Sequence, residues 1–149
     1  ISFSQIKFGI VMKKYEFLYK VMFSDCDPAK IVFYPKYFQW FDIATQKMFN
    51  QAGLEWSKFW PENDLAGLPI VDASATFKGP ARMDDELVIE SWIEKCREKI
   101  FVVNHRIIKN GEVIVEGQEV RACVKQDKSS EKGIKAVPLP EEAVRMLTK

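Results

Sequence analysis

The sequence is poor in the residues on which several common kinds of functional site depend. It has three cysteines, Cys26, Cys96 and Cys123, and no CxxC pair, so neither a disulfide framework nor a zinc knuckle is expected. Its one histidine, His105, falls within an apolar strand pattern, which favours a structural role and makes a histidine-rich metal site improbable. No GxSxG motif occurs, so a serine hydrolase is not expected either.

Long apolar runs and a strong net charge are also missing. No stretch reaches the roughly 18 apolar residues of a membrane-spanning helix, so no membrane partner is predicted. The net charge of +1 gives no overall attraction to nucleic acid. The sequence has no phosphate loop or dinucleotide fingerprint, and no cofactor is predicted. Unpaired cysteines, with no recognisable signal peptide, favour a cytoplasmic protein.

The length of 149 residues fits one domain, and 47% hydrophobic with 29% charged residues is an ordinary globular composition. Met12-Lys13-Lys14 has the character of a natural start. We therefore expect a single domain over residues 1–149, in which residues 1–11 are a non-native or disordered leader. A signal peptide is the alternative, but residues 1–11 lack a long apolar core.

Hydrophobic periodicity predicts one long helix among strands. Alternation over Tyr15–Phe23 is typical of a half-buried strand. From Pro35 to Ala52 apolar residues recur every three or four positions, proline suits the first helical position, and Gly53 can cap the end. Further strands are predicted at Leu68–Lys78, Glu86–Lys95, Ile100–Lys109 and Glu112–Lys125, and a short helix at Pro138–Lys149.

The order of these elements predicts an α+β fold. Asn110-Gly111 lies between two apolar runs, which is a strong hairpin signal because both turn residues need a positive φ. A strand, a long helix and four more strands suit a curved antiparallel sheet of about five strands wrapped around one helix.

Chemistry-bearing residues are densest between Ser24 and Asp42. Asp25 and Asp27 flank a cysteine at the end of the first predicted strand, just before the long helix. One interpretation is a simple turn, because aspartate before proline is common in loops. The other is a carboxylate beside a helix N-terminus, where free N–H groups can polarise a carbonyl oxygen. The spacing alone favours the turn.

The full string DCDPAKIVFYPKYFQWFD closely resembles the signature DCDPAGIVFYPxYxxWFD of the 4-hydroxybenzoyl-CoA thioesterase family of hot-dog proteins. The resemblance continues through the predicted strands to about Lys125. It implies a hot-dog fold and hydrolysis of acyl-CoA thioesters without a metal or organic cofactor.

The resemblance also implies roles for particular residues. Asp27 matches the catalytic carboxylate, which attacks the thioester carbon or activates water, and the backbone N–H of Tyr34 matches the group that polarises the carbonyl. Arg97 and Lys99 match basic positions that hold coenzyme A phosphates; a solvated strand end is the alternative. Asp42 matches an acid that meets the ring hydroxyl of hydroxybenzoyl substrates; alternatively it faces solvent or a neighbouring subunit. Short aliphatic acyl groups remain open as substrates.

Two positions depart from the family pattern. Lys30 replaces a glycine, which indicates a positive φ at this position or a reshaped loop. Glu98 stands where the family often has arginine, which predicts weaker phosphate binding.

The resemblance further implies a homo-oligomer, a dimer or a tetramer, whose sites lie between subunits and whose exposed strand edges are covered. Two other functions stay open at this point. One is a non-catalytic acyl-CoA-binding module, which would have no need of Asp27, and the other is a thioesterase acting on acyl carrier protein.

Overall fold

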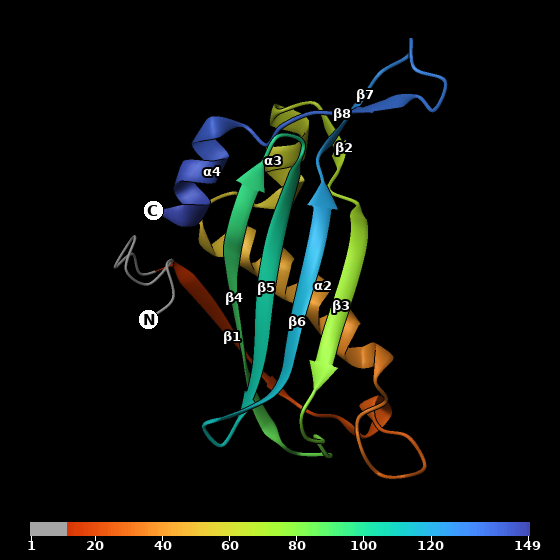
Figure 1. Ribbon diagram of the computed structural model, residues 1–149, viewed down its shortest axis with the longest axis vertical. Coiled ribbons are helices and arrows are strands. Elements are labelled where there is room, and N and C mark those ends of the chain that lie inside the picture. The colour runs from red at the N-terminus through yellow and green to blue at the C-terminus, as the bar shows by residue number, and fades with distance from the viewer. Residues whose placement is uncertain (1–11) are drawn as a thin grey trace.

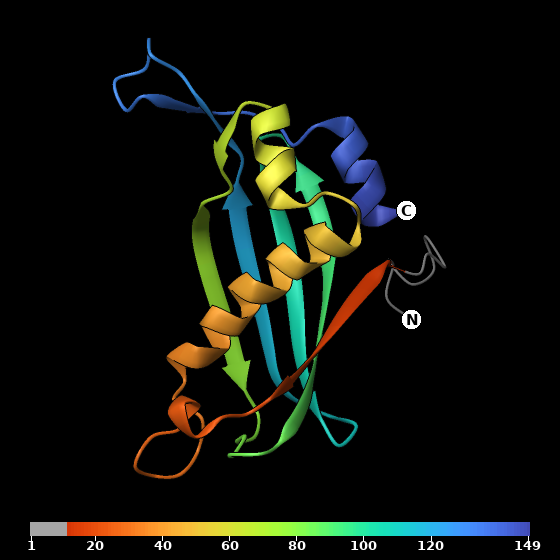
Figure 2. The ribbon, with the colours of Figure 1, turned by 180° about the vertical axis from the view of Figure 1, so that it is seen from behind.

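A five-stranded antiparallel sheet curves around one long helix in the computed structural model, which describes residues 12–149. The predicted leader, residues 1–11, lies outside the described residues. Helix α2 (Pro35–Gln51) crosses one face of the sheet diagonally (Figures 1 and 2). The strand order is β1-β4-β5-β6-β3. The strands are β1 (Lys14–Lys20), β3 (Ile70–Phe77), β4 (Glu86–Arg97), β5 (Ile100–Lys109) and β6 (Glu112–Ala122).

Smaller elements gather at one end of this sheet. Helix α3 (Trp56–Glu62) follows α2, and α4 (Glu141–Thr148) lies near the C-terminus (Figure 1). A second sheet has the order β2-β7-β8, made of β2 (Leu65–Gly67), β7 (Val124–Gln126) and β8 (Ile134–Ala136). At the other end, the 3-10 helix η1 (Phe23–Asp25) and a loop lead into α2.

The α+β architecture and the order of its main elements are as predicted. Both turn residues of the β5–β6 hairpin have a positive φ, 51° at Asn110 and 81° at Gly111. Helix α2 is apolar over a broad part of its circumference, which explains why the sheet curves around it. Three of its own side chains, those of Phe41, Met48 and Phe49, are completely buried.

Several predicted strand boundaries were wrong, and three of them have a clear physical reason. The first strand ends at Lys20 instead of continuing to Phe23, whose side chain is 81% exposed, because the chain turns into η1. The strand predicted over Leu68–Lys78 is β3 from Ile70 onward, because Pro69 has no N–H to donate to a ladder. The strand predicted over Glu112–Lys125 is interrupted at Cys123, where the chain leaves the large sheet for the small one.

Gly117 in β6 leaves room for helix α2 to pack close against the sheet. A Cβ atom at this glycine would lie 2.3 Å from two ring atoms of Phe41. The Phe41 ring cannot swing aside easily, because it is buried and stacks on His105 with 4.8 Å between ring centroids and 10° between planes. Gly117 thus sets how closely the helix packs on the strands.

We therefore expect Gly117→Ala to lower the free energy of unfolding by about 1–3 kcal/mol, the range of an overpacked core. Gly79→Ala is the matched control, because its added Cβ would meet only Ile114, at an ordinary 3.5 Å. Urea unfolding of both variants checks the prediction. Equal stability of the two would show that α2 adjusts freely over the sheet.

Candidate active site

The loop before α2 holds Asp27 through its own backbone and side chain. The Asp27 N–H donates to the Ile31 carbonyl at 2.9 Å, and the Lys30 N–H donates to the Asp27 carbonyl at 2.8 Å. The Ala29 N–H donates to Asp27 Oδ1 at 2.9 Å, as in an Asx turn. Among residues 12–149 no hydrogen bond reaches Asp27 Oδ2, so one carboxylate oxygen fixes the turn and the other is available.

The first turn of α2 presents a backbone donor close in sequence to this loop. The Phe33 N–H donates to the Asp25 carbonyl at 2.9 Å, and Pro35 has no N–H. Between them, the Tyr34 N–H has no hydrogen-bond partner in the described part of the chain. A free N–H at a helix N-terminus, where the helix dipole is positive, suits a partly negative oxygen.

Asp25, the other acid of the pair, is committed to the fold. Its side chain is buried and accepts hydrogen bonds from the Tyr19 hydroxyl at 2.6 Å and the Met22 N–H at 2.8 Å. Lys36 lies 3.9 Å from its other oxygen. Burial, with the hydrogen bond to Asp25, raises the pKa of Tyr19 to about 12. Of the two acids, Asp27 therefore has the less engaged carboxylate.

Asp27 lies at the edge of an open hollow of about 590 Å³. Its other lining side chains are mostly apolar, and Lys30 is the second charged one. The lining residues are Phe23, Cys26, Asp27, Pro28, Lys30 and Met83. A mostly apolar hollow with few polar groups is the usual form of a small-molecule site.

Asp42 lies along α2, away from this hollow, and pairs with Arg121. Its Oδ1 is 2.5 Å from Nη2 of Arg121, a side chain that is itself buried. The two residues border a second hollow of about 500 Å³, which Trp56, Trp60 and Leu68 also line. Within one chain, then, Asp27 and Asp42 belong to different hollows.

A buried polar network continues from Arg121 under the helix. Glu119 accepts hydrogen bonds from Arg121 Nη2 at 2.9 Å, from the Thr45 hydroxyl at 2.5 Å and from His105 Nε2 at 3.1 Å. His105 Nδ1 is 2.7 Å from the Ser91 hydroxyl. This histidine is thus a satisfied core residue, as its strand pattern predicts, and it ties α2 to β4, β5 and β6.

Burial and the neighbouring groups together set the protonation states in this network. Burial lowers the pKa of His105, so we take the ring as neutral, with Nε2 donating to Glu119. Burial alone would raise the pKa of Glu119, but its hydrogen bond with His105 and the nearby positive charge of Arg121 outweigh burial and lower the pKa to about 2. Glu119 and Arg121 therefore form a buried ion pair, which Asp42 extends to the surface.

Arg97 and Lys99 lie at the opposite end of the sheet from Asp27. Arg97 ends β4 and Lys99 lies in the β4–β5 turn. The Asp27 loop instead bonds to the chain before β4, through Val32 N–H to the Ala81 carbonyl at 2.8 Å (Figures 1 and 2). The twelve residues of β4 separate the two ends by roughly 36 Å. One chain does not bring the predicted catalytic and phosphate-binding residues together.

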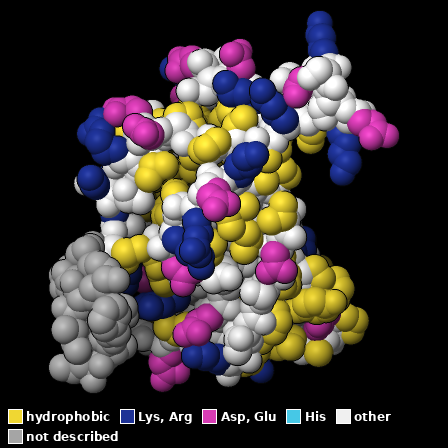
Figure 3. Space-filling view, turned by 45° about the horizontal axis from the view of Figure 1, so that its top comes forward, with side chains coloured by type: hydrophobic (Ala, Val, Ile, Leu, Met, Phe, Trp, Pro, Cys, Tyr) yellow, Lys and Arg dark blue, Asp and Glu magenta, His cyan; other side chains and the backbone are white. Residues whose placement is uncertain are grey.

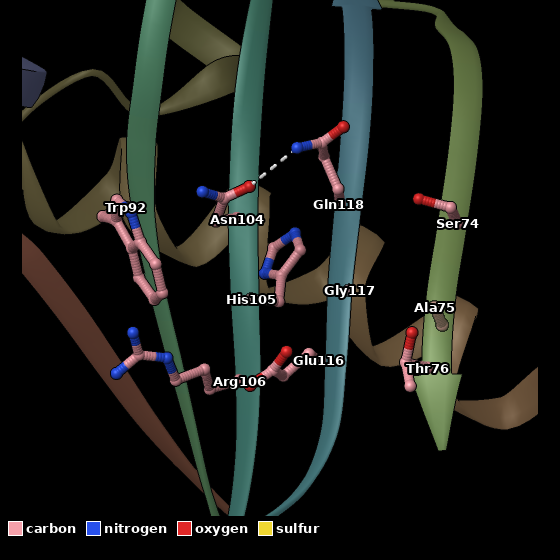
Figure 4. A pocket seen from close by; sticks show the side chains of 10 residues that line it. All are labelled: Ser74, Ala75, Thr76, Trp92, Asn104, His105, Arg106, Glu116, Gly117 and Gln118. Carbon is pink, nitrogen blue, oxygen red and sulfur yellow. Dashed lines mark hydrogen bonds between the residues drawn. The ribbon is translucent and has the colours of Figure 1, made fainter. Parts of the chain in front are cut away.

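The outer face of the sheet has a shallow polar hollow that contains no predicted site residue (Figure 4). Its side chains bond to one another: Gln118 donates to Asn104 at 3.2 Å, and the Arg106 guanidinium lies 4.7 Å from the centre of the Trp92 ring. Sequence reasoning missed this hollow, since strand alternation marks only which residues face outward.

Metal-binding clusters and membrane-spanning helices are both absent among residues 12–149. No group of three or more His, Cys, Asp or Glu side chains there is placed to hold a metal ion. No helix in that range has the length and apolarity needed to span a bilayer.

Comparison with known proteins gives the class of this protein. The family model described as the Thioesterase-like superfamily matches residues 21–147. The 4-hydroxybenzoyl-CoA thioesterase of Pseudomonas sp. (strain CBS-3) is 32% identical over 133 residues, which are 85% of this chain and 92% of that protein. A 1,4-dihydroxy-2-naphthoyl-CoA hydrolase of Synechococcus sp. (strain CC9605) is 28% identical over 101 residues, 65% of this chain and 68% of that protein.

Solved structures that superimpose on this chain belong to the same class of enzyme. The Pseudomonas 4-hydroxybenzoyl-CoA thioesterase superimposes with a TM-score of 0.81 at 30% identity, covering 89% of this chain and 98% of the other. A gentisyl-coenzyme A thioesterase superimposes with a TM-score of 0.74 at 32% identity, covering 91% and 98%.

The protein is therefore a hot-dog thioester hydrolase. More particularly, the chain belongs to the Thioesterase-like superfamily that includes 4-hydroxybenzoyl-CoA thioesterase.

Lys30 adopts a backbone conformation that is rare for its residue type. Its φ is 65°, as its place in a glycine position of the family pattern predicts. The left-handed region costs a residue with a Cβ about 1–2 kcal/mol relative to its preferred conformations. The lysine is held there because its N–H closes the Asp27 turn.

We expect Lys30→Gly to raise the free energy of unfolding by about 1 kcal/mol, because glycine adopts this φ without strain. Lys30→Ala removes the same charge but keeps the Cβ, so it should bring no such gain. Urea unfolding compares the two variants. If alanine stabilises as much as glycine does, the side chain rather than the backbone is the source of strain.

Proposed function

We propose that the protein hydrolyses the thioester bond of an acyl- or aroyl-CoA to the free acid and coenzyme A, with Asp27 as nucleophile or general base. The observation that carries the proposal is the uncommitted oxygen of Asp27 in the loop that leads to the free Tyr34 N–H. The names of the relatives add support, since 4-hydroxybenzoyl-, gentisyl- and 1,4-dihydroxy-2-naphthoyl-CoA are all aroyl thioesters. An aspartate-to-asparagine mutant of 4-hydroxybenzoyl-CoA thioesterase has been solved with 4-hydroxybenzoyl-CoA.

The chemistry follows from these two groups. The thioester oxygen accepts the Tyr34 N–H, which stabilises the negative charge that develops on it. Asp27 Oδ2 attacks the carbonyl carbon, the C–S bond breaks, and its electron pair leaves with the coenzyme A sulfur. Water then cleaves the resulting anhydride. Alternatively, Asp27 takes a proton from water, whose oxygen attacks the same carbon.

Asp27→Asn should lower kcat at least about a hundredfold, because it removes the charge but keeps the size of the side chain. Asp25→Asn is the control, and we expect it to lower stability more than turnover, since Asp25 is bonded within the fold. Thiol release from a panel of aroyl- and acyl-CoAs checks both, with circular dichroism to verify folding. Near-wild-type turnover in a folded Asp27→Asn variant defeats the assignment.

The same panel separates the alternatives. A non-catalytic module would bind acyl-CoA without releasing thiol from any member of the panel. A carrier-protein thioesterase would turn over acyl carrier protein thioesters and spare their coenzyme A counterparts.

We propose further that the protein is a homo-oligomer, at least a dimer, with each site shared between two subunits. Strand β3 is an edge strand of the large sheet, and nearly all its residues are exposed, including Ile70, Val71 and Phe77. Such an edge favours pairing with another strand. Antiparallel pairing of β3 with its own copy by a twofold axis would put the Asp27 end of one chain beside the β4–β5 turn of the other.

This arrangement would bring the predicted catalytic and phosphate-binding residues together. The Asp27 site of one subunit would then have two cations for the coenzyme A phosphates, Arg97 of the partner subunit and Lys99 of the partner subunit. The hollow beside Asp42 lies on the β3 edge of the sheet, so the same pairing would bring it toward the Asp27 loop of the partner subunit. Its tryptophan rings suit an aromatic acyl group, and Arg121 orients the Asp42 carboxylate, which can accept a hydrogen bond from a ring hydroxyl.

Subunit mixing tests the shared site. Asp27→Asn protein and an Arg97→Ala, Lys99→Ala double variant should each have low kcat/KM alone. If the residues act across the interface, a remixed equimolar sample should recover about a quarter of wild-type kcat/KM, because half of its dimers are mixed and each holds one intact site. No recovery in mixed dimers, verified by mass spectrometry, would place all these residues in one subunit's site or in none.

A further inference from the structure

Lys30 places a cation in the hollow that Asp27 borders. Among residues 12–149, these two side chains are the charged ones in its lining, and the rest are Phe23, Cys26, Pro28 and Met83. Over the face of the molecule drawn in Figure 3, basic and acidic side chains are interspersed with one another and with uncharged ones. The hollow differs, because its two opposite charges stand against mostly apolar side chains. The mechanism described above uses Asp27 and gives Lys30 no role.

The Lys30 side chain is not engaged with an acid of its own chain. None of the salt bridges among residues 12–149 includes Lys30. The next lysine along the chain, Lys36, lies instead 3.9 Å from Asp25. A lysine ammonium carries three N–H donors on a flexible stem, so that of Lys30 is available to a bound substrate.

The turn keeps Lys30 next to Asp27 at a cost in backbone strain. The φ of 65° at Lys30 lies in the left-handed region, which is unfavourable for a residue with a Cβ. Its N–H closes the turn by donating to the Asp27 carbonyl at 2.8 Å. Strained residues of this kind cluster at functional sites. The strain therefore points to a role for the Lys30 side chain beside the Asp27 carboxylate.

We propose that Lys30 is a further catalytic residue, the general acid that protonates the sulfur of coenzyme A as the thioester is cleaved. The inference rests on the proposed function, in which Asp27 or a water molecule that it activates attacks the carbonyl carbon. The sulfur is bonded to that same carbon, so it must lie beside the Asp27 carboxylate during the reaction. Lys30 lines the same hollow as Asp27 and brings an N–H donor to this place.

The proton transfer answers a problem of the reaction itself. As the C–S bond breaks, its electron pair moves to the sulfur, and a bare thiolate is poorly stabilised against apolar side chains. Nζ of Lys30 gives the sulfur a proton, so coenzyme A leaves as a thiol and the lysine becomes a neutral amine. The proton that is released when water is consumed then restores the ammonium. A positioned acid of this kind speeds a reaction by roughly a hundredfold or more.

The experiment compares two leaving groups in the full-length protein. One substrate is an aroyl-CoA, and the other is the thiophenol thioester of the same acid, whose thiol is acidic enough to leave without a proton. Lys30→Gln keeps the Cβ, and with it the backbone strain, but removes the ammonium. Lys78→Gln is the matched control, because Lys78 pairs with Glu116 at 3.0 Å and lies outside the hollow.

We expect Lys30→Gln to lower kcat/KM for the aroyl-CoA about tenfold, less than for a fully buried general acid, because Lys30 is exposed and water replaces part of its function. Hydrolysis of the thiophenol thioester should change much less, and Lys78→Gln should alter neither. Equal loss on both thioesters overturns the proposal, since Lys30 would then bind substrate or support the loop. Full activity on both overturns it too, since water would then supply the proton. Absence of thiol release from the aroyl-CoA by the wild-type protein would instead refute the proposed function.

Discussion

The close contact between helix α2 and strand β6 is the constraint on which the rest of the structure depends. Gly117 has no side chain, so Phe41 can lie against the strand and stack on His105. Beside it, Thr45, His105, Glu119 and Arg121 form a buried polar network between the helix and strands β5 and β6. Such a network tolerates only one position of its partners, because an unpaired buried charge is costly.

The position of the candidate catalytic groups follows from this contact. Once α2 is fixed in the middle, its first turn is fixed too, and with it the direction of the Tyr34 N–H. The Asp27 loop is then held from both sides, by its own turn and by the bonds of Asp25 to Tyr19 and Met22. The loop is therefore held by other groups, and Asp27 Oδ2 accepts no hydrogen bond from residues 12–149.

Periodicity and turn chemistry predicted most of this fold, because α2 and the long strands are long enough to repeat their patterns. Helix α3 and strands β2 and β8 were missed, and β7 was taken as the end of the preceding strand, since three to seven residues are too few for a period to emerge. The candidate site at Asp27 came from a local motif. The pairing of Asp42 with Arg121 was not, because it joins residues far apart in sequence, and the separation of Asp27 from Arg97 requires knowledge of where each end of β4 lies.

A crystal structure of the Asp27→Asn variant with an aroyl-CoA bound would test the central claim, a thioesterase site shared by two subunits, most directly. We expect the thioester oxygen within hydrogen-bond distance of the Tyr34 N–H, and the coenzyme A phosphates against Arg97 of the partner subunit and Lys99 of the partner subunit. A thioester bound away from Tyr34, or phosphates held within the same chain or by other residues, would contradict it.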